Sequence, residues 1–288
     1  MLYYGVITIA VAMFSVNFFF SQLFQKSYGS GARASFVLSA GSSSIAFFFL
    51  LCLNGFRFEF TIFTFLMALL TSLNGIGFTF CSLKALGKIN LSLYSVFSML
   101  GGMALPFAAG ILFYDEALTL GKIICFVIII IALFLTVEKG GNRSGYLYYA
   151  GIFILNGMSG VLSKIFQAGP FAKASATGFS ILSSLITVII SLVCLLVIKG
   201  EKKPLNRTAF LSMAGNGILN RVANLLLLVA LAHLPASAQY PFVTGGVMIF
   251  STLIAYFTPN KPSKREIATV VLSFIGILAL VLLPHIPL

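Results

Sequence analysis

Ten long apolar segments separated by short polar connections fill almost the whole chain. They cover about residues 2–24, 34–53, 60–83, 90–112, 118–137, 145–166, 174–198, 208–232, 236–258 and 266–284. Each is close to the roughly 20 residues that an α-helix needs to cross the hydrocarbon core of a bilayer. The segments lack the alternating pattern of an outer-membrane barrel, and a helix satisfies its own backbone hydrogen bonds in lipid. The sequence therefore predicts an all-α integral membrane protein with ten transmembrane helices.

The composition favours the same class. Of the 288 residues, 59% are hydrophobic and 8% are charged, whereas a soluble domain carries roughly 25% charged residues. So few charges cannot cover a water-facing surface. No Lys or Arg precedes the first segment and no small-residue cleavage site follows it, so we interpret it as a membrane helix rather than a signal peptide. We expect a multi-pass protein of the plasma (inner) membrane.

The net charge of +12 is spread over many short connections. It therefore indicates membrane topology rather than nucleic-acid binding. Connections after odd-numbered segments hold 13 of the 18 cations, namely Lys26, Arg33, Lys84, Lys88, Lys139, Arg143, Lys199, Lys202, Lys203, Arg207, Lys261, Lys264 and Arg265. The opposite side holds 4, namely Arg57, Lys122, Lys164 and Lys173. The positive-inside rule places the richer side in the cytoplasm and both termini outside.

The chain contains an internal repeat. SQLFQ at 21–25 recurs as SKIFQ at 163–167, and Gly pairs stand at 101–102 and 245–246. We interpret both pairs as close-packing points. The offset stays between 142 and 145 residues, so the two halves are about 1–140 and 144–288. Each half holds five segments, and an odd number makes the second half enter the membrane from the opposite side. Such inverted repeats are typical of secondary transporters, with a binding site near the membrane midplane.

Residues 84–135 resemble the C-terminal half of an EamA domain of the drug/metabolite transporter superfamily. Residues 230–283 resemble the second copy, with AQYPFVTGGVMIFSTLIAYF as the most characteristic stretch. The resemblance implies ten helices in two inverted halves, a central cavity and movement of small metabolites. It also implies termini in the cytoplasm, against the charge count, and both topologies stay open. The chain departs from the family in having no Trp, and in carrying Asn260 where the second copy usually repeats the glutamate of Glu116.

One apolar segment contains an arginine, in the stretch NGILNRVANLLLL at 216–228. At 100° per residue, Asn216, Asn220, Asn224, Gly217 and Arg221 occupy one continuous sector of the helix. A charge in the middle of a membrane costs about 2.5–3.5 kcal/mol even on the permissive insertion scale. The polar sector must therefore face protein or a wet cavity rather than lipid.

The six acidic residues all lie at connections or segment ends, so Arg221 has no acid at its own depth. Arginine stays protonated and can bind a carboxylate or phosphate with two parallel hydrogen bonds. The equivalent position in the first half is Ile76 or Gly77, so the scaffold does not require this charge. These observations predict an anion site, while capping of backbone carbonyls or snorkelling along a cavity is the alternative.

The remaining candidate site residues are polar side chains inside apolar segments. The predicted substrate-binding set is Arg221, Asn220, Asn224, Asn216, Gln239, Tyr240, Tyr94, Asn17 and Asn156. Ser and Thr residues are more readily explained as contacts between membrane helices.

Several functions are disfavoured by missing motifs. The chain has no phosphate-binding loop, no Ser–His pair, Asp dyad or metal cluster at midplane, and no membrane-embedded carboxylate for a cationic drug. We therefore expect no enzyme activity, cofactor, metal or nucleic-acid partner. The sequence predicts a secondary transporter of small anionic or zwitterionic metabolites, such as amino acids. A lipid-linked carrier or flippase, whose headgroup phosphate would meet Arg221, is the alternative, and both a monomer and a homodimer are compatible with the sequence.

Overall fold

The computed structural model describes residues 2–29, 31–86, 91–135, 146–198, 204–256 and 264–283. In this part of the chain every regular element is an α-helix. The helices are α1 (Leu2–Tyr28), α2 (Ala32–Leu53), α3 (Ile62–Leu86), α4 (Leu91–Tyr114), α5 (Leu120–Leu135), α6 (Tyr146–Ala168), α7 (Ala176–Val197), α8 (Arg207–Leu231), α9 (Ala236–Tyr256) and α10 (Lys264–Leu282). The all-helical class is confirmed. Each helix matches one expected segment, and the largest difference is at the end of α1, which continues to Tyr28 instead of ending at 24.

Five of the described segments are long and apolar enough to cross a membrane. They are Leu2–Tyr28, Ala32–Leu53, Ile62–Cys81, Ala176–Val197 and Arg207–Leu231. Their outward faces carry large apolar side chains, such as Leu196, which is 88% exposed. A water-soluble surface would not expose so many of them, whereas lipid accepts them. Length, composition and exposure therefore fit an α-helical membrane protein.

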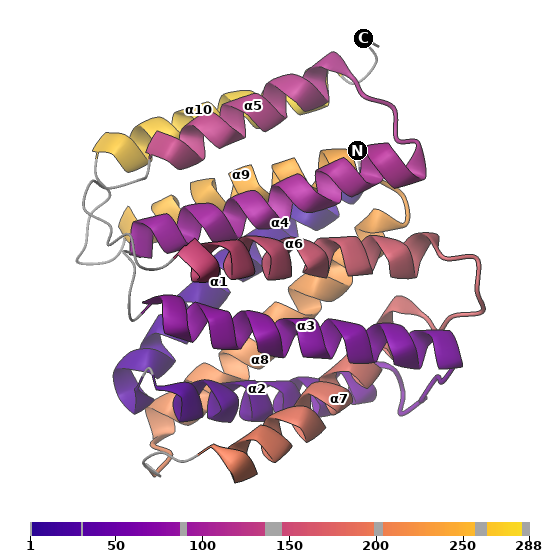
Figure 1. The fold of residues 1–288 in the computed structure, drawn as a ribbon, viewed down its shortest axis with the longest axis vertical. Helices are drawn as coiled ribbons and strands as arrows, with labels where there is room; N and C mark the ends of the chain where they lie inside the picture. Colours follow the sequence, from indigo (N-terminus) through magenta and orange to yellow (C-terminus); the bar gives the residue numbers. More distant parts are fainter. Residues whose placement is uncertain are drawn as a thin grey trace.

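The helices lie in stacked layers (Figure 1). α5 and α10 lie at the top of the view, α4 and α9 lie below them, and α2 and α7 lie at the bottom, while α1, α3, α6 and α8 fill the space between. Closest packing joins helices that are distant in sequence: α1 contacts α8 and α9, α6 contacts α3 and α4, α2 contacts α7, and α5 contacts α10. The N-terminal five helices thus interleave with the C-terminal five.

Buried side chains form four clusters at helix crossings instead of one central core. One cluster joins α4, α5, α9 and α10 around Met103 and Ile129, and another joins α3, α6, α7 and α8 around Phe166 and Phe179. Two smaller clusters hold α1 against α2 and α8 and against α8 and α9. Each group of three or four helices is therefore held together by its own cluster of buried side chains.

The Gly pairs lie at close contacts between helices. A Cβ at Gly101 of α4 would overlap the backbone of Phe153 in α6, and a Cβ at Gly246 of α9 would lie 2.9 Å from Val11 in α1. Both positions need a residue without a side chain, and small residues are common at interfaces between membrane helices. Their interpretation as close-packing points is confirmed.

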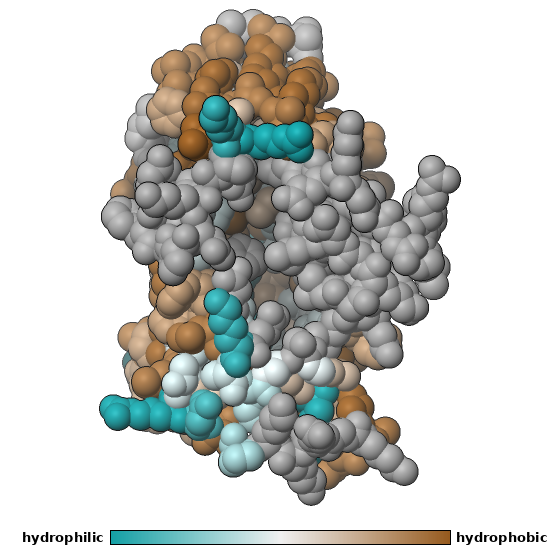
Figure 2. Space-filling model, turned by 90° about the vertical axis from the view of Figure 1, so that its left-hand side faces the viewer, coloured by the Kyte–Doolittle hydropathy of each residue, from teal (hydrophilic) through white to brown (hydrophobic). Residues whose placement is uncertain are grey.

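The cations divide between the two ends of the helices. Figure 2 looks at the end where α1 finishes and α2, α8 and α10 begin, and hydrophilic side chains gather there. The described cations of this end are Lys26, Arg33, Arg207, Lys264 and Arg265. The other eight residues of the richer group lie outside the described side chains. The assignment of this end to the cytoplasm stays a prediction.

Candidate functional site

Arg221 lies near the middle of α8, and within the described part of the chain its guanidinium donates hydrogen bonds to hydroxyl groups alone. Its Nη1 is 3.4 Å from Ser183 Oγ, and its Nη2 is 3.4 Å from Ser43 Oγ and 3.3 Å from Thr187 Oγ1. These acceptors come from α2 and α7, so the side chain connects three helices. The distances exceed the usual 2.7–3.2 Å range, and every acceptor is neutral. The hydroxyls therefore solvate the guanidinium without compensating its charge.

The hydroxyls around Arg221 belong to a polar face of α7. Ser180, Ser183, Thr187 and Ser191 recur at helical spacing and are buried, so they share one side of the helix. The hydroxyls of Thr187 and Ser183 donate to backbone carbonyls of their own helix, at 2.7 and 3.2 Å. Their protons are thus engaged, and their lone pairs are free to face Arg221. These partners were not among the predicted site residues, although the serine spacing in the sequence was a visible signal.

Arg221 has no acidic partner in the part of the chain that the structure describes. The ion pair found there is between Lys164 and Glu116, at 2.5 Å. Glu59 and Asp115 lie, like Glu116, in connections between helices. Glu138 and Glu201 and the side chain of Glu266 lie outside the described residues. A fixed cation without a fixed anion remains able to bind one from solution.

The other polar residues of α8 have different surroundings. Asn216 donates from Nδ2 to Ser21 Oγ of α1 at 2.7 Å. Asn224 donates to the carbonyl oxygen of Asn220 at 2.8 Å and to its Oδ1 at 3.1 Å. Asn224 is nevertheless exposed within a helix that could span a membrane. An exposed amide at such a position favours a wet space over lipid.

Three further candidates connect helices without contacting Arg221. Asn156 of α6 donates from Nδ2 to the carbonyl oxygen of Ser98 at 2.6 Å, and Tyr240 of α9 donates to the carbonyl oxygen of Gly160 at 3.1 Å. Gln239 is fully buried and donates to the carbonyl oxygen of Leu227 at 3.0 Å. None of these bonds includes Arg221. Their described contacts hold helices together.

The last two candidates are Asn17 and Tyr94. Asn17 of α1 is 7% exposed, and its Oδ1 has no hydrogen-bond partner among the described residues. Tyr94 belongs to α4, but its side chain lies outside the described part.

Asn74 of α3 was missed by the sequence analysis. It donates from Nδ2 to the carbonyl oxygen of Leu155 at 2.8 Å and to Ser159 Oγ at 2.9 Å, both on α6. Asn74 and Asn216 are 142 residues apart, which is the repeat offset. Each binds a serine of the first helix of the opposite half. The offset itself was the signal that could have identified Asn74.

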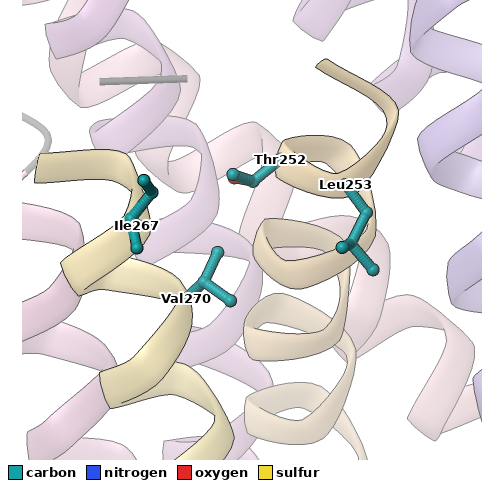
Figure 3. A pocket seen from close by; sticks show the side chains of 4 residues that line it. All are labelled: Thr252, Leu253, Ile267 and Val270. Carbon is teal, nitrogen blue, oxygen red and sulfur yellow. The ribbon is translucent and has the colours of Figure 1, made fainter. Parts of the chain in front are cut away.

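The described pockets are apolar and lie away from Arg221. One of about 170 Å³ is lined by Thr252, Leu253, Ile267 and Val270, between α9 and α10 (Figure 3). Another of about 200 Å³ lies where α1, α9 and α10 meet and includes Phe242. Neither pocket is lined by a cationic side chain.

Glu116 is the centre of a second polar cluster, in the connection between α4 and α5. Its Oε1 accepts from Lys164 Nζ at 2.5 Å and from the N–H of Ala236 at 2.8 Å. Its Oε2 accepts from the N–H and the hydroxyl of Ser237, at 2.8 and 2.6 Å. Burial alone would raise the pKa of Glu116, but these hydrogen bonds outweigh it and lower the pKa below its ordinary value.

The lowered pKa predicts how stability depends on pH. A carboxyl with a lower pKa in the folded state stabilises the protein fully above its unfolded value, about 4.3, and loses that effect as the pH falls through the folded value. We expect Glu116→Gln to lower the melting temperature at pH 7 and the difference from wild type to shrink below about pH 4. Circular dichroism in detergent measures this in a chain without Trp.

The neighbouring Asp115 provides a control for this experiment. It is exposed, and its carboxylate accepts no described hydrogen bond. Asp115→Asn should therefore change the melting temperature little, both at pH 7 and below about pH 4. A wild-type advantage over Glu116→Gln that stays constant or grows on acidification would contradict the prediction.

Comparison with known proteins shows the fold alone. No protein-family model matches the chain, and no curated protein matches it. A crystal structure described only as that of a protein superposes with a TM-score of 0.78, covers 98% of this chain and 96% of its own, and is 16% identical. At this identity the likeness establishes a shared helical architecture and no activity.

Proposed function

We propose that this protein is a secondary transporter of small anionic or zwitterionic metabolites, and that Arg221 binds the negative group of the substrate. The observation that carries the proposal is the unneutralised guanidinium in the middle of α8, with three neutral acceptors at 3.3–3.4 Å. A charge in a membrane helix is expensive, and such residues usually mark substrate pathways. An anion from solution would supply the missing negative charge.

The helix contacts support two inverted five-helix halves, 1–140 and 144–288, and hence ten membrane spans. The repeat makes α1 to α5 the counterparts of α6 to α10, in order. When each helix is exchanged with its counterpart, the contact of α1 with α8 becomes that of α6 with α3, and the contact of α4 with α6 becomes that of α9 with α1; all four contacts are present. The pairs α2 with α7 and α5 with α10 map onto themselves. A pseudo-two-fold axis in the membrane plane would produce this pattern, and it permits alternating access.

The resemblance to EamA domains agrees with this function. A protein of this kind would lie in the plasma (inner) membrane. The charge count favours the more cationic end of Figure 2 in the cytoplasm, whereas the family resemblance implies the opposite orientation. The exposed amide of Asn224 beside Arg221 gives the substrate a second polar contact on α8.

A phosphate-headgroup lipid carrier is the second candidate. The apolar pocket between α9 and α10 is the observation in its favour, since it could accept part of an acyl chain (Figure 3). Arg221, however, contacts α2 and α7, which lie at the other end of the stack of layers in Figure 1. The amphiphile would have to reach across the intervening helices, so the small-metabolite function is better supported.

The test is a thermal-shift comparison with four chemically matched ligands: alanine, propionate, ethylamine and glycerol phosphate. A ligand at 100 times its Kd stabilises the folded state by about 2.7 kcal/mol. We expect alanine or propionate to raise the melting temperature of the wild type but not of Arg221→Ala, and ethylamine to raise neither. Stabilisation by glycerol phosphate alone would favour the lipid-linked candidate. Equal shifts in wild type and variant would refute the role of Arg221.

A further inference from the structure

The carboxylate of Glu116 joins three elements that belong to different parts of the chain. It lies in the α4–α5 connection, pairs with Lys164 of α6 and accepts from the first two residues of α9. Its side chain is only 7% exposed. These bonds are charge-assisted, and a negative charge at a helix N-terminus is favourable. The cluster therefore holds the α4–α5 connection, α6 and α9 firmly together at this point.

The connection itself is shaped to present this carboxylate. Asp115 has a φ of 50°, an unusual value for a residue other than Gly, and the N–H of Glu116 donates to the carbonyl oxygen of Gly110 at 3.1 Å. A Cβ at Gly110 would lie 2.5 Å from Glu116 Oε2. Lys122 Nζ donates to the carbonyl oxygen of Ala117 at 2.5 Å. These contacts direct the Glu116 carboxylate at α6 and α9.

The start of α9 has no cap of its own. α7 and α8 begin with local caps, because Ser175 accepts from Gly178 and Asn206 accepts from Ala209. Pro235 precedes Ala236 and has no side-chain acceptor, so Glu116, 120 residues away, fills that role. A local cap moves with its helix. A cap from the other half must break if the two halves separate at this end.

A second carboxylate acts across the halves at the same end. Glu59, in the α2–α3 connection, accepts from the N–H of Ser175 at 2.5 Å and from its hydroxyl at 3.0 Å, at the start of α7. At the opposite end the described polar contacts between the halves include no carboxylate. Arg33 donates to the carbonyl oxygen of Ile198 at 2.9 Å, and Asn206 to that of Ser27 at 3.4 Å. The Glu116 end is therefore the one held shut by fixed negative charge.

We infer that Glu116 is the gate residue of this end of the transporter. Its bonds to Lys164 and to the start of α9 hold the two halves together in the conformation of this structure, and they break when the substrate site opens to that side. Glu116 is a positioning residue, because it acts through α6 and α9 and does not contact Arg221. The inference rests on the proposed transport function and adds which contacts alternate.

The test measures distances between spin labels in lipid nanodiscs. Labels at Leu118 and Ala232 report the Glu116 end, and labels at Lys26 and Lys264 report the opposite end. All four side chains are exposed, and the background has its four cysteines replaced and a melting curve like that of wild type. We expect Glu116→Gln to widen the first distance by about 5 Å, the scale of a one-turn helix shift, and to narrow the second.

The second distance separates a gate from an ordinary cap. Loss of a structural cap would loosen the Glu116 end alone, so widening there without narrowing at the opposite end would overturn the inference. Unchanged distances at both ends would overturn it as well. Asp115→Asn, which leaves the bonds of Glu116 in place, should change neither distance.

Two features keep this experiment decisive. If Glu116→Gln does not fold, Lys164→Met removes the ion pair and leaves the Glu116 carboxylate bound to the start of α9. Widening at the Glu116 end with narrowing at the opposite end would again support the inference, and widening alone or no change would overturn it. The distances require no substrate, so a negative result leaves the Arg221 ligand test untouched. Conversely, if the ligand test fails, the distances still show whether the Glu116 bonds hold the two halves in one conformation, whatever the substrate is.

Discussion

Arg221→Ala should reduce substrate transport at least about 30-fold, because truncating one partner of a desolvated charge pair costs about 2–5 kcal/mol. The fold should survive, since the variant loses three long bonds to neutral hydroxyls and also removes a costly intramembrane charge. Arg221→Lys should keep partial transport, because it retains the charge and loses the two-pronged geometry. Counterflow of a labelled ligand in proteoliposomes measures both effects.

Arg207→Ala is the matched control for this experiment. Arg207 is exposed at the first residue of the same helix, so removing its charge tests whether any arginine of α8 matters. It should transport like the wild type. Normal counterflow by folded Arg221→Ala would remove the basis of the anion site.

Ser43→Asp should abolish anion binding while keeping Arg221. The Ser43 hydroxyl lies 3.4 Å from the guanidinium, so a carboxylate in its place would form an internal ion pair and compete with the substrate. Its effective concentration is that of an attached group and exceeds that of any free ligand. We expect the ligand-induced thermal shift to vanish and transport to fall to the Arg221→Ala level. Because the two neighbouring charges then neutralise each other, the melting temperature should change little or rise.

Ser43→Asn separates charge from size. Asn has nearly the same shape as Asp but no charge, so it should retain most of the ligand-induced shift. If Ser43→Asp and Ser43→Asn bind and transport alike, the negative charge is irrelevant and Arg221 does not bind anions. The comparison also distinguishes blockage of the site from distortion of α2.

The positions of the helices could be predicted closely from sequence. A membrane-spanning helix is a local object: it needs about 20 apolar residues and satisfies its own hydrogen bonds. The ends of α7 and α8, where Ser175 and Asn206 accept from residues three positions later, are local for the same reason. The repeat offset likewise links Asn74 to Asn216 before any coordinates are considered.

The candidate site could be predicted only in part. The polar sector of α8 follows from helical periodicity, but its side chains have different partners, since Asn216 meets Ser21 of α1 whereas Arg221 meets α2 and α7. Gln239, Tyr240 and Asn156 were grouped with Arg221 on polarity alone, and their described bonds join helices without including Arg221. Polarity within an apolar segment does not say whether a side chain contacts a ligand or a neighbouring helix.

The sequence by itself determined the ten helices and a cation in α8 with no acid at its depth, because segment length, periodicity and charge are read along one chain. Only the tertiary structure placed Ser43, Ser183 and Thr187 around that cation and brought Glu116 to the start of α9. Such contacts depend on how helices pack across more than 100 residues of intervening chain, and no local pattern specifies that register.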